Sequence, residues 1–130
     1  MKQLLYLLSI SIGGAIGALS RYAMSLLIPR ETLSSFPWST FVVNVSGAFF
    51  AGLLLAFSIK FEIPTHVKLF VLVGLLGAFT SFSTFALENV LLITSGKAYL
   101  ALANILASNI FAIVAFYLGF LLTRIFASCR

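Results

Sequence analysis

Charged residues are scarce in this sequence. Only 8% of its 130 residues are charged, and Asp and Glu together number 3. Soluble domains have about a quarter of their residues charged, so the composition excludes an ordinary soluble domain. Hydrophobic residues make up 62% of the chain, and its mean hydropathy is +1.16. We therefore predict an integral membrane protein with a single transmembrane domain, residues 1–130, and no separate soluble enzyme domain.

Cysteine and histidine each occur only once. Cys129 is the single cysteine and stands next to the last residue, so no disulfide within the chain is expected. His66 falls in a polar turn, and no nucleophile stands with a general base in a recognisable pattern. The sequence therefore predicts that the protein is not an enzyme. The Lys and Arg residues are scattered, which is typical of topology signals and head-group contacts and not of nucleic-acid binding.

Long apolar stretches are what the sequence has in abundance. Four of them occur, at residues 4–28, 38–59, 67–93 and 99–125. A helix needs about 20 such residues to cross the hydrocarbon core of a bilayer. The loops are short, so neighbouring helices are antiparallel and four crossings bring both termini to one side. We therefore predict an all-α, multi-pass protein of the cell membrane.

The third stretch contains a polar cluster at membrane depth. Its 27 residues would extend about 40 Å as a straight helix, longer than the ~30 Å core. Its middle reads GAFTSFSTF at residues 77–85. Glycine adopts non-helical angles at low cost, and Ser and Thr offer the backbone alternative hydrogen bonds. The pattern predicts either a break between Gly77 and Thr84 or a hydroxyl-rich face for helix packing.

Every stretch also contains a polar side chain that is costly in lipid: Arg21, Asn44, Glu88, and Asn104 with Ser108. Arg21 indicates either a functional charge or a side chain that reaches the interface. Asn44 indicates either a contact between helices or a group that faces water. Four such signals on four helices favour a shared polar pathway or a homo-oligomer over unrelated contacts.

The donors among these groups favour an anion as the transported species. Glu88 is the only carboxylate within a stretch, whereas cation pathways usually use carboxylate rings. Phe82 and Phe85 are three residues apart, about 60° in helical projection. Their electropositive ring edges can therefore complement an anion along one side of the helix. Packing remains the alternative interpretation of these rings.

Three motifs resemble the fluoride channel family known as Fluc or CrcB. GAFTSFSTF with Glu88 resembles the family's GGxTTFSTFxxE, and GGAIGALSRY at residues 13–22 resembles its GGxxGAxxRY. STFVVNVSGAFFAG at residues 39–52 resembles its GTxxVNxxGxxxxG. The departures are Ser39 and Ala78 for glycine and Ser81 for threonine, all small or hydroxyl-bearing. Asn104 stands where many relatives have an aromatic residue, so its role is open.

This resemblance implies a fold and a function beyond what spacing shows. It implies an antiparallel, dual-topology dimer, either of identical chains or of this chain with a sister subunit. Two fluoride pathways would flank the interface, and the third helices would break where they cross. The backbone carbonyls of Gly77 and Thr80 would hold a central, structural sodium ion. The function implied is passive export of cytoplasmic fluoride, and hence fluoride resistance.

The resemblance also assigns side chains to the fluoride pathway: Asn44, Phe82, Ser83, Thr84, Phe85 and Ser108. Asn44 would donate a hydrogen bond to the anion, and the two phenylalanines would present ring edges. Ser108, with Ser83 or Thr84, would continue a polar track. Arg21 and Glu88 would lie in a vestibule or make structural contacts.

Two other functions fit four short spans. A small proton-coupled multidrug or cation transporter would have a carboxylate in its first helix and an aromatic cage for cations. The first stretch here has Arg21 and no acid, which argues against that function. The second alternative is a non-transporting assembly subunit, in which the polar residues only hold helices together.

Overall fold

Four long apolar helices build the molecule. The computed structural model describes residues 1–28 and 35–128, so Cys129 lies outside it. The first two spans are α1 (Lys2–Leu27) and α2 (Trp38–Lys60). The third span covers Thr65–Thr94 in several segments, and the fourth is α6 (Ala98–Ser128). All four are long and apolar enough to cross a membrane, which confirms the prediction of an all-helical, four-span chain.

The third span is not one continuous α-helix. It begins with α3 (Thr65–Lys68), continues as the π-helix η1 (Leu69–Leu76) and ends its first half with α4 (Gly77–Phe79). Thr80 (φ −73°, ψ 152°) and Ser81 (φ −143°, ψ 101°) are extended. The span then resumes as α5 (Phe82–Thr94). Two residues of extended backbone therefore lie in the middle of the hydroxyl cluster.

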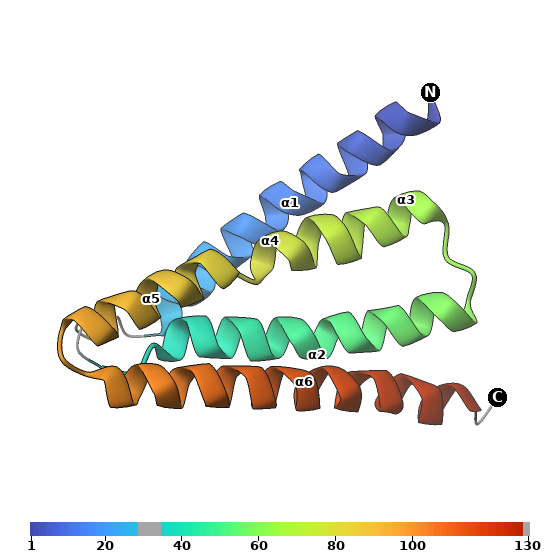
Figure 1. Cartoon of the computed structure of the whole chain (residues 1–130). Coiled ribbons are helices and arrows are strands. Elements are labelled where there is room, and N and C mark those ends of the chain that lie inside the picture. Colours follow the sequence, from blue (N-terminus) through green and yellow to red (C-terminus); the bar gives the residue numbers. More distant parts are fainter. Residues whose placement is uncertain (29–34, 129–130) are drawn as a thin grey trace.

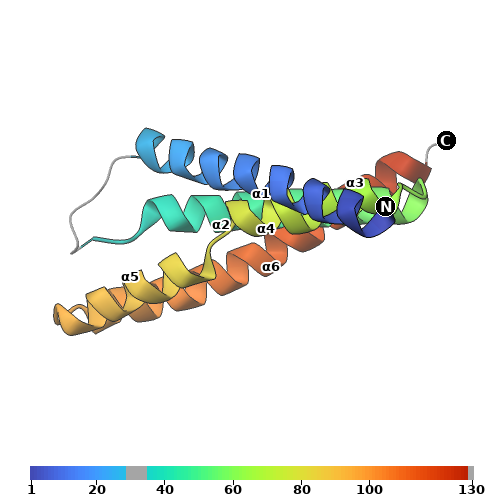
Figure 2. The same ribbon diagram turned by 90° about the horizontal axis from the view of Figure 1, so that it is seen from above.

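The extended residues let the third span change neighbours. Its first half, η1 and α4, packs against α1, whereas its second half, α5, packs against α6. The other large helix contact is between α2 and α6. Figures 1 and 2 show α4 running beside α1 and α5 diverging from it to lie along α6. The break at Thr80 and Ser81 is thus the point at which the span crosses from one helix pair to the other.

Glycines allow the closest helix contacts. A Cβ at Gly17 would collide with the carbonyl oxygen of Leu75, and one at Gly52 would collide with the carbonyl oxygen of Phe116. Backbones therefore touch directly between α1 and η1 and between α2 and α6, as in small-residue packing of membrane helices.

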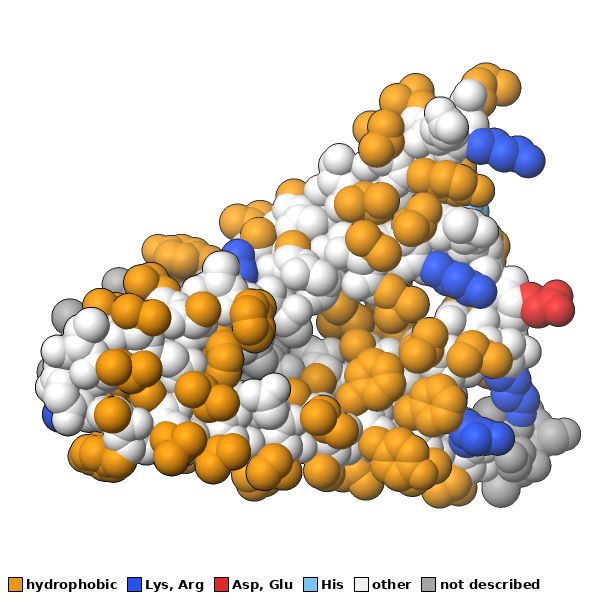
Figure 3. Space-filling model, in the orientation of Figure 1, with side chains coloured by type: hydrophobic (Ala, Val, Ile, Leu, Met, Phe, Trp, Pro, Cys, Tyr) orange, Lys and Arg blue, Asp and Glu red, His pale blue; other side chains and the backbone are white. Residues whose placement is uncertain are grey.

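The outer surface of the molecule is mainly apolar, and its charged side chains lie largely at one end. Both chain ends and the connection from α2 to α3 lie at one end, as four crossings require (Figure 1). Hydrophobic side chains cover most of the visible face, and Lys, Arg and acidic side chains gather at that end (Figure 3). Within each span only 11–28% of the most apolar window is buried. This apolar surface suits contact with lipid or with another membrane subunit, because exposing so large an apolar surface to water is unfavourable.

Candidate functional site

The site is built around the break in the third span. Ser81 has extended backbone, and its N–H donates to the side-chain oxygen of Asn44 on α2 at 2.9 Å. In a continuous helix that N–H would donate to the carbonyl of Gly77, four residues earlier. Nδ2 of Asn44 lies 3.5 Å from the carbonyl oxygen of Ser81, a distance at the limit of a hydrogen bond. Asn44 therefore stabilises the break, because its side-chain oxygen accepts the hydrogen bond of a backbone N–H that has no partner within the helix.

Ser81 also starts the next helix. Its Oγ accepts the backbone N–H of Thr84 at 3.2 Å, which makes it the N-cap of α5. The same Oγ lies 2.7 Å from Oγ1 of Thr84 and 3.3 Å from Oγ of Ser83. The hydroxyl of Ser81 thus caps the start of α5 and satisfies one of the N–H groups that a helix leaves unpaired at its beginning within the membrane.

A cavity of about 420 Å³ lies on one side of this cap. We call it the charged cavity; its polar lining is Arg21, Tyr22, Ser25, Ser39, Thr40, Ser81, Thr84 and Glu88. Thr40 donates its hydroxyl hydrogen to Oε1 of Glu88 at 2.7 Å. Oε2 of Glu88 is buried and has no hydrogen-bond partner among the described residues. The cavity therefore combines one cationic and one acidic side chain with several hydroxyls.

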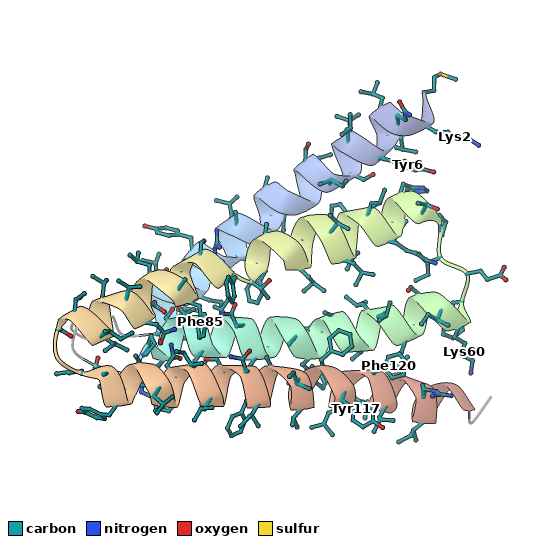
Figure 4. The ribbon with its side chains drawn as sticks, in the orientation of Figure 1. Lys2, Tyr6, Lys60, Phe85, Tyr117 and Phe120 are labelled. Atoms are coloured by element: carbon teal, nitrogen blue, oxygen red, sulfur yellow. The ribbon has the colours of Figure 1, made fainter. Side chains whose placement is uncertain are left out.

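A second cavity, of about 250 Å³, lies beside the same break. We call it the aromatic cavity; it is lined by Asn44, Thr80, Phe82, Phe85, Ser108, Asn109, Ala112 and Ile113. The rings of Phe82 and Phe85 are 5.6 Å apart between centroids and tilted by 37°. Phe85 is 9% exposed and lies on the side of α5 that faces α2 and α6 (Figure 4). Phe82 is 80% exposed, so this wall of the cavity opens to the outside of the chain.

A buried set of hydrogen bonds joins α5 to α6 behind the aromatic cavity. Asn104 donates to Oδ1 of Asn89 at 3.1 Å, and Ser108 donates to Oδ1 of Asn104 at 2.9 Å. Asn89 in turn donates to the carbonyl oxygen of Phe85 at 2.8 Å. Asn104 is 1% exposed, so these amides satisfy one another out of contact with lipid.

The structure divides the predicted site residues between the two cavities. Asn44, Phe82, Phe85 and Ser108 line the aromatic cavity, whereas Arg21, Thr84 and Glu88 line the charged cavity. Ser83 is exposed and lines neither cavity. Ser108 and Thr84 therefore do not share a cavity within one chain.

The backbone at the break matches the chemistry of a hard cation. Gly77 has lost the N–H of Ser81 as its helical donor, and the ψ of 152° at Thr80 turns its carbonyl away from the helix. Neutral carbonyl oxygens of this kind are the ligands that hard cations prefer. The donor chemistry of Gly77 and Thr80 thus fits a sodium ion.

Sequence reasoning missed Thr40, Asn89 and the capping role of Ser81. Thr40 precedes Asn44 by four residues and so shares its helix face, a signal that was available. Ser81 stands just before the apolar periodicity resumes, which is where an N-cap is expected. Nothing in the sequence alone indicated that Asn89 would face Asn104 on another helix.

Together, fold and site define a multi-pass integral membrane protein with a polar break at mid-span. The family follows from comparison with known proteins. Residues 8–120 match the family model described as CrcB-like protein, Camphor Resistance (CrcB).

A relative from Magnetococcus marinus is 44% identical over 117 residues, 89% of this chain and 95% of the relative. One from Azobacteroides pseudotrichonymphae is 42% identical over 118 residues, 90% of this chain and 94% of the relative. One from Ruminiclostridium cellulolyticum is 38% identical over 130 residues, 98% of this chain and 99% of the relative. Each of these relatives is named fluoride-specific ion channel FluC. The chain belongs to the CrcB family.

Proposed function

We propose that the protein is a fluoride-selective ion channel that gives passive export of cytoplasmic fluoride across the cell membrane. The relatives that share 38–44% of its residues are named fluoride-specific ion channels. The observation that supports the proposal most is the aromatic cavity, whose lining has amides, hydroxyls and phenyl rings but no carboxylate. Such a lining attracts an anion without a full opposite charge that would trap it. The protein is therefore a transport protein and not an enzyme.

The proposed pathway runs through the aromatic cavity. The side-chain N–H groups of Asn44 are only weakly hydrogen-bonded, because Nδ2 lies 3.5 Å from the carbonyl oxygen of Ser81. Asn44 therefore donates to the anion, while Phe82 and Phe85 offer the positive edges of their rings. Arg21 raises the local concentration of anions in the charged cavity. Ser83 and Thr84 continue the polar surface at the start of α5.

We further propose that the working unit is an antiparallel, dual-topology dimer with two pores. The open wall of the aromatic cavity at Phe82, 80% exposed in one chain, supports completion of each pore by a second subunit. That subunit is either an identical chain or a divergent sister chain. Because each pore then uses residues of both subunits, a dimer has two of them.

A structural sodium ion belongs to the same proposal. The carbonyl oxygens of Gly77 and Thr80 from each subunit would hold it at the crossing of the third spans. The ion would supply positive charge that compensates the carbonyl dipoles gathered at the two breaks. Replacing sodium with a large organic cation is expected to lower fluoride flux and weaken the dimer, measured by electrode and by size-exclusion chromatography. Flux and dimer content indifferent to sodium would contradict this assignment.

Ion flux from liposomes tests the function itself. Purified protein in vesicles loaded with equal fluoride and chloride should release fluoride at least about a hundredfold faster, as expected of a selective pore. Ion-selective electrodes measure both anions in one experiment, and protein-free vesicles give the background. Equal release of both anions, strict coupling to protons, or no release would contradict the proposal. The second outcome would instead support a proton-coupled transporter, and the third an assembly subunit.

A further inference from the structure

The hydrogen bonds behind the aromatic cavity form a chain with a fixed direction. The carbonyl oxygen of Phe85 has no hydrogen, so Asn89 must turn its nitrogen toward it. The oxygen of Asn89 then faces Asn104, which must present its own nitrogen in return. Consequently the oxygen of Asn104 faces Ser108, whose hydroxyl must donate. Turning either amide around would bring two oxygens together, so the backbone carbonyl sets the direction of the whole chain.

This direction determines which atoms Ser108 offers to the cavity. A serine hydroxyl has one hydrogen and two lone pairs, and here the hydrogen is 2.9 Å from its acceptor on Asn104. Ser108 is 6% exposed and lines the aromatic cavity. It therefore turns lone pairs toward the cavity, and these accept hydrogen bonds from water but do not bind an anion.

Asn44 is in the opposite position on the same cavity. Its side-chain oxygen is occupied by the N–H of Ser81 at 2.9 Å, whereas its nitrogen has only the 3.5 Å contact. Asn44 thus turns hydrogens toward the cavity while Ser108 turns lone pairs. An ion that meets few donors is held weakly enough to leave, which conduction requires.

We propose that Asn104 is a positioning residue that withdraws the hydroxyl hydrogen of Ser108 from the anion. The aromatic cavity then has a donating wall at Asn44 and an accepting wall at Ser108. This inference rests on the proposed fluoride function and assigns a role to a residue that touches no ion.

The test compares Ser108→Ala, Asn104→Leu and the double variant with the unmodified protein in liposomes. Fluoride flux is measured over a range of fluoride concentrations, and dimer content is checked by size-exclusion chromatography. Ser108→Ala is the reference for the double variant, and its loss of flux should be smaller than the loss in Asn44→Ala, because no donor to the anion is removed. Asn104→Leu frees the Ser108 hydrogen, so the half-saturating fluoride concentration should fall about three- to tenfold, the usual worth of one hydrogen bond. Adding Ser108→Ala to it should restore the original value.

Several results would overturn the inference. A loss of about tenfold or more in Ser108→Ala would mean that the hydroxyl donates to fluoride directly. An unchanged half-saturating concentration in Asn104→Leu would mean that no donor was being withheld. A shift that persists in the double variant would mean that Asn104 acts without Ser108. Absence of flux in the unmodified protein would instead count against the proposed fluoride function, so the two failures are distinguishable.

Discussion

The charged cavity and the aromatic cavity meet at one hydrogen-bonded pair, Asn44 and Ser81, yet they differ in chemistry. The charged cavity has Arg21 and Glu88 on its wall, whereas the aromatic cavity has no charged side chain. The first is about 420 Å³ and the second about 250 Å³. Full charge is therefore confined to the larger space, and the smaller one is left with dipoles and phenyl rings.

The difference separates two tasks of an anion pathway. A cationic side chain in a wide space gathers anions from solution, because its field acts over several ångströms. A full charge inside the aromatic cavity would hold the ion too strongly for conduction. Neutral donors and ring edges bind more weakly, so the ion passes from one to the next.

The largest effect is expected for Asn44→Ala, which removes the residue of the aromatic cavity that is hydrogen-bonded to Ser81 of the charged cavity. The variant loses the donor to the anion and also the acceptor that holds the N–H of Ser81 at 2.9 Å. Two lost hydrogen bonds of this kind correspond to about ten- to a hundredfold lower fluoride flux. The measurement is fluoride release from liposomes, with dimer content checked in parallel.

Asn109→Ala is the matched control, because Asn109 lines the aromatic cavity but is exposed and donates to the carbonyl of Ile105 in its own helix. Its flux should stay within about threefold of the unmodified protein. Similar losses in Asn44→Ala and Asn109→Ala would contradict the special role given to the hydrogen bond between Asn44 and Ser81.

Arg21→Gln should have a smaller effect, which depends on salt. Removing the cation from the charged cavity lowers the local anion concentration, so flux should fall about three- to tenfold at low ionic strength. The deficit should shrink in a few hundred millimolar of an impermeant salt, because screening then acts within several ångströms. Lys2→Gln at the distant end of α1 is the control. A deficit that is equal at all ionic strengths would assign Arg21 a structural role.

Thr40→Val should change flux least and stability most clearly. Thr40 is the one hydrogen-bond donor to Glu88 among the described residues, at 2.7 Å, and Oε2 of Glu88 already has no partner there. Leaving a buried acceptor unsatisfied costs about 1–3 kcal/mol, so the thermal unfolding midpoint should fall. Thr94→Val is the control, because its hydroxyl donates only to carbonyls of its own helix. Equal midpoints in the two variants would show that Thr40 does not stabilise Glu88.

The sequence predicted the four spans because about 20 apolar residues in a row admit few other structures. The observed helices differ from the predicted stretches by a few residues at their ends, where caps and fraying decide. The composition of residues 77–85 also singled out the segment that holds Thr80 and Ser81. Which helix each half of that span contacts depends on tertiary packing, so periodicity could not supply it.

The candidate site was predicted less completely. Asn44, Phe82, Phe85 and Ser108 stood out as polar or aromatic groups at membrane depth, and the fold brings them to one cavity. The placement of Thr84 in the other cavity was not predictable. It depends on the cap of α5, where the hydroxyls of Ser81 and Thr84 face the charged cavity. The contact of Asn89 with Asn104 joins two helices and has no local signal in the sequence.

Substituting the two phenyl rings of the aromatic cavity shows directly whether ring edges stabilise the anion there. Phe82→Ile and Phe85→Ile keep apolar volume, a kind of swap that typically costs less than about 1.5 kcal/mol. Phe79→Ile is the control, since Phe79 packs near Gly47 on α2 and does not line the aromatic cavity. Each variant is checked for dimer by size-exclusion chromatography and then for fluoride release from liposomes. We expect intact dimers in all three variants, with flux lowered at least about tenfold in Phe82→Ile and Phe85→Ile because an electrostatic partner of the anion is lost. Full flux in both of these variants would show that the rings only fill space.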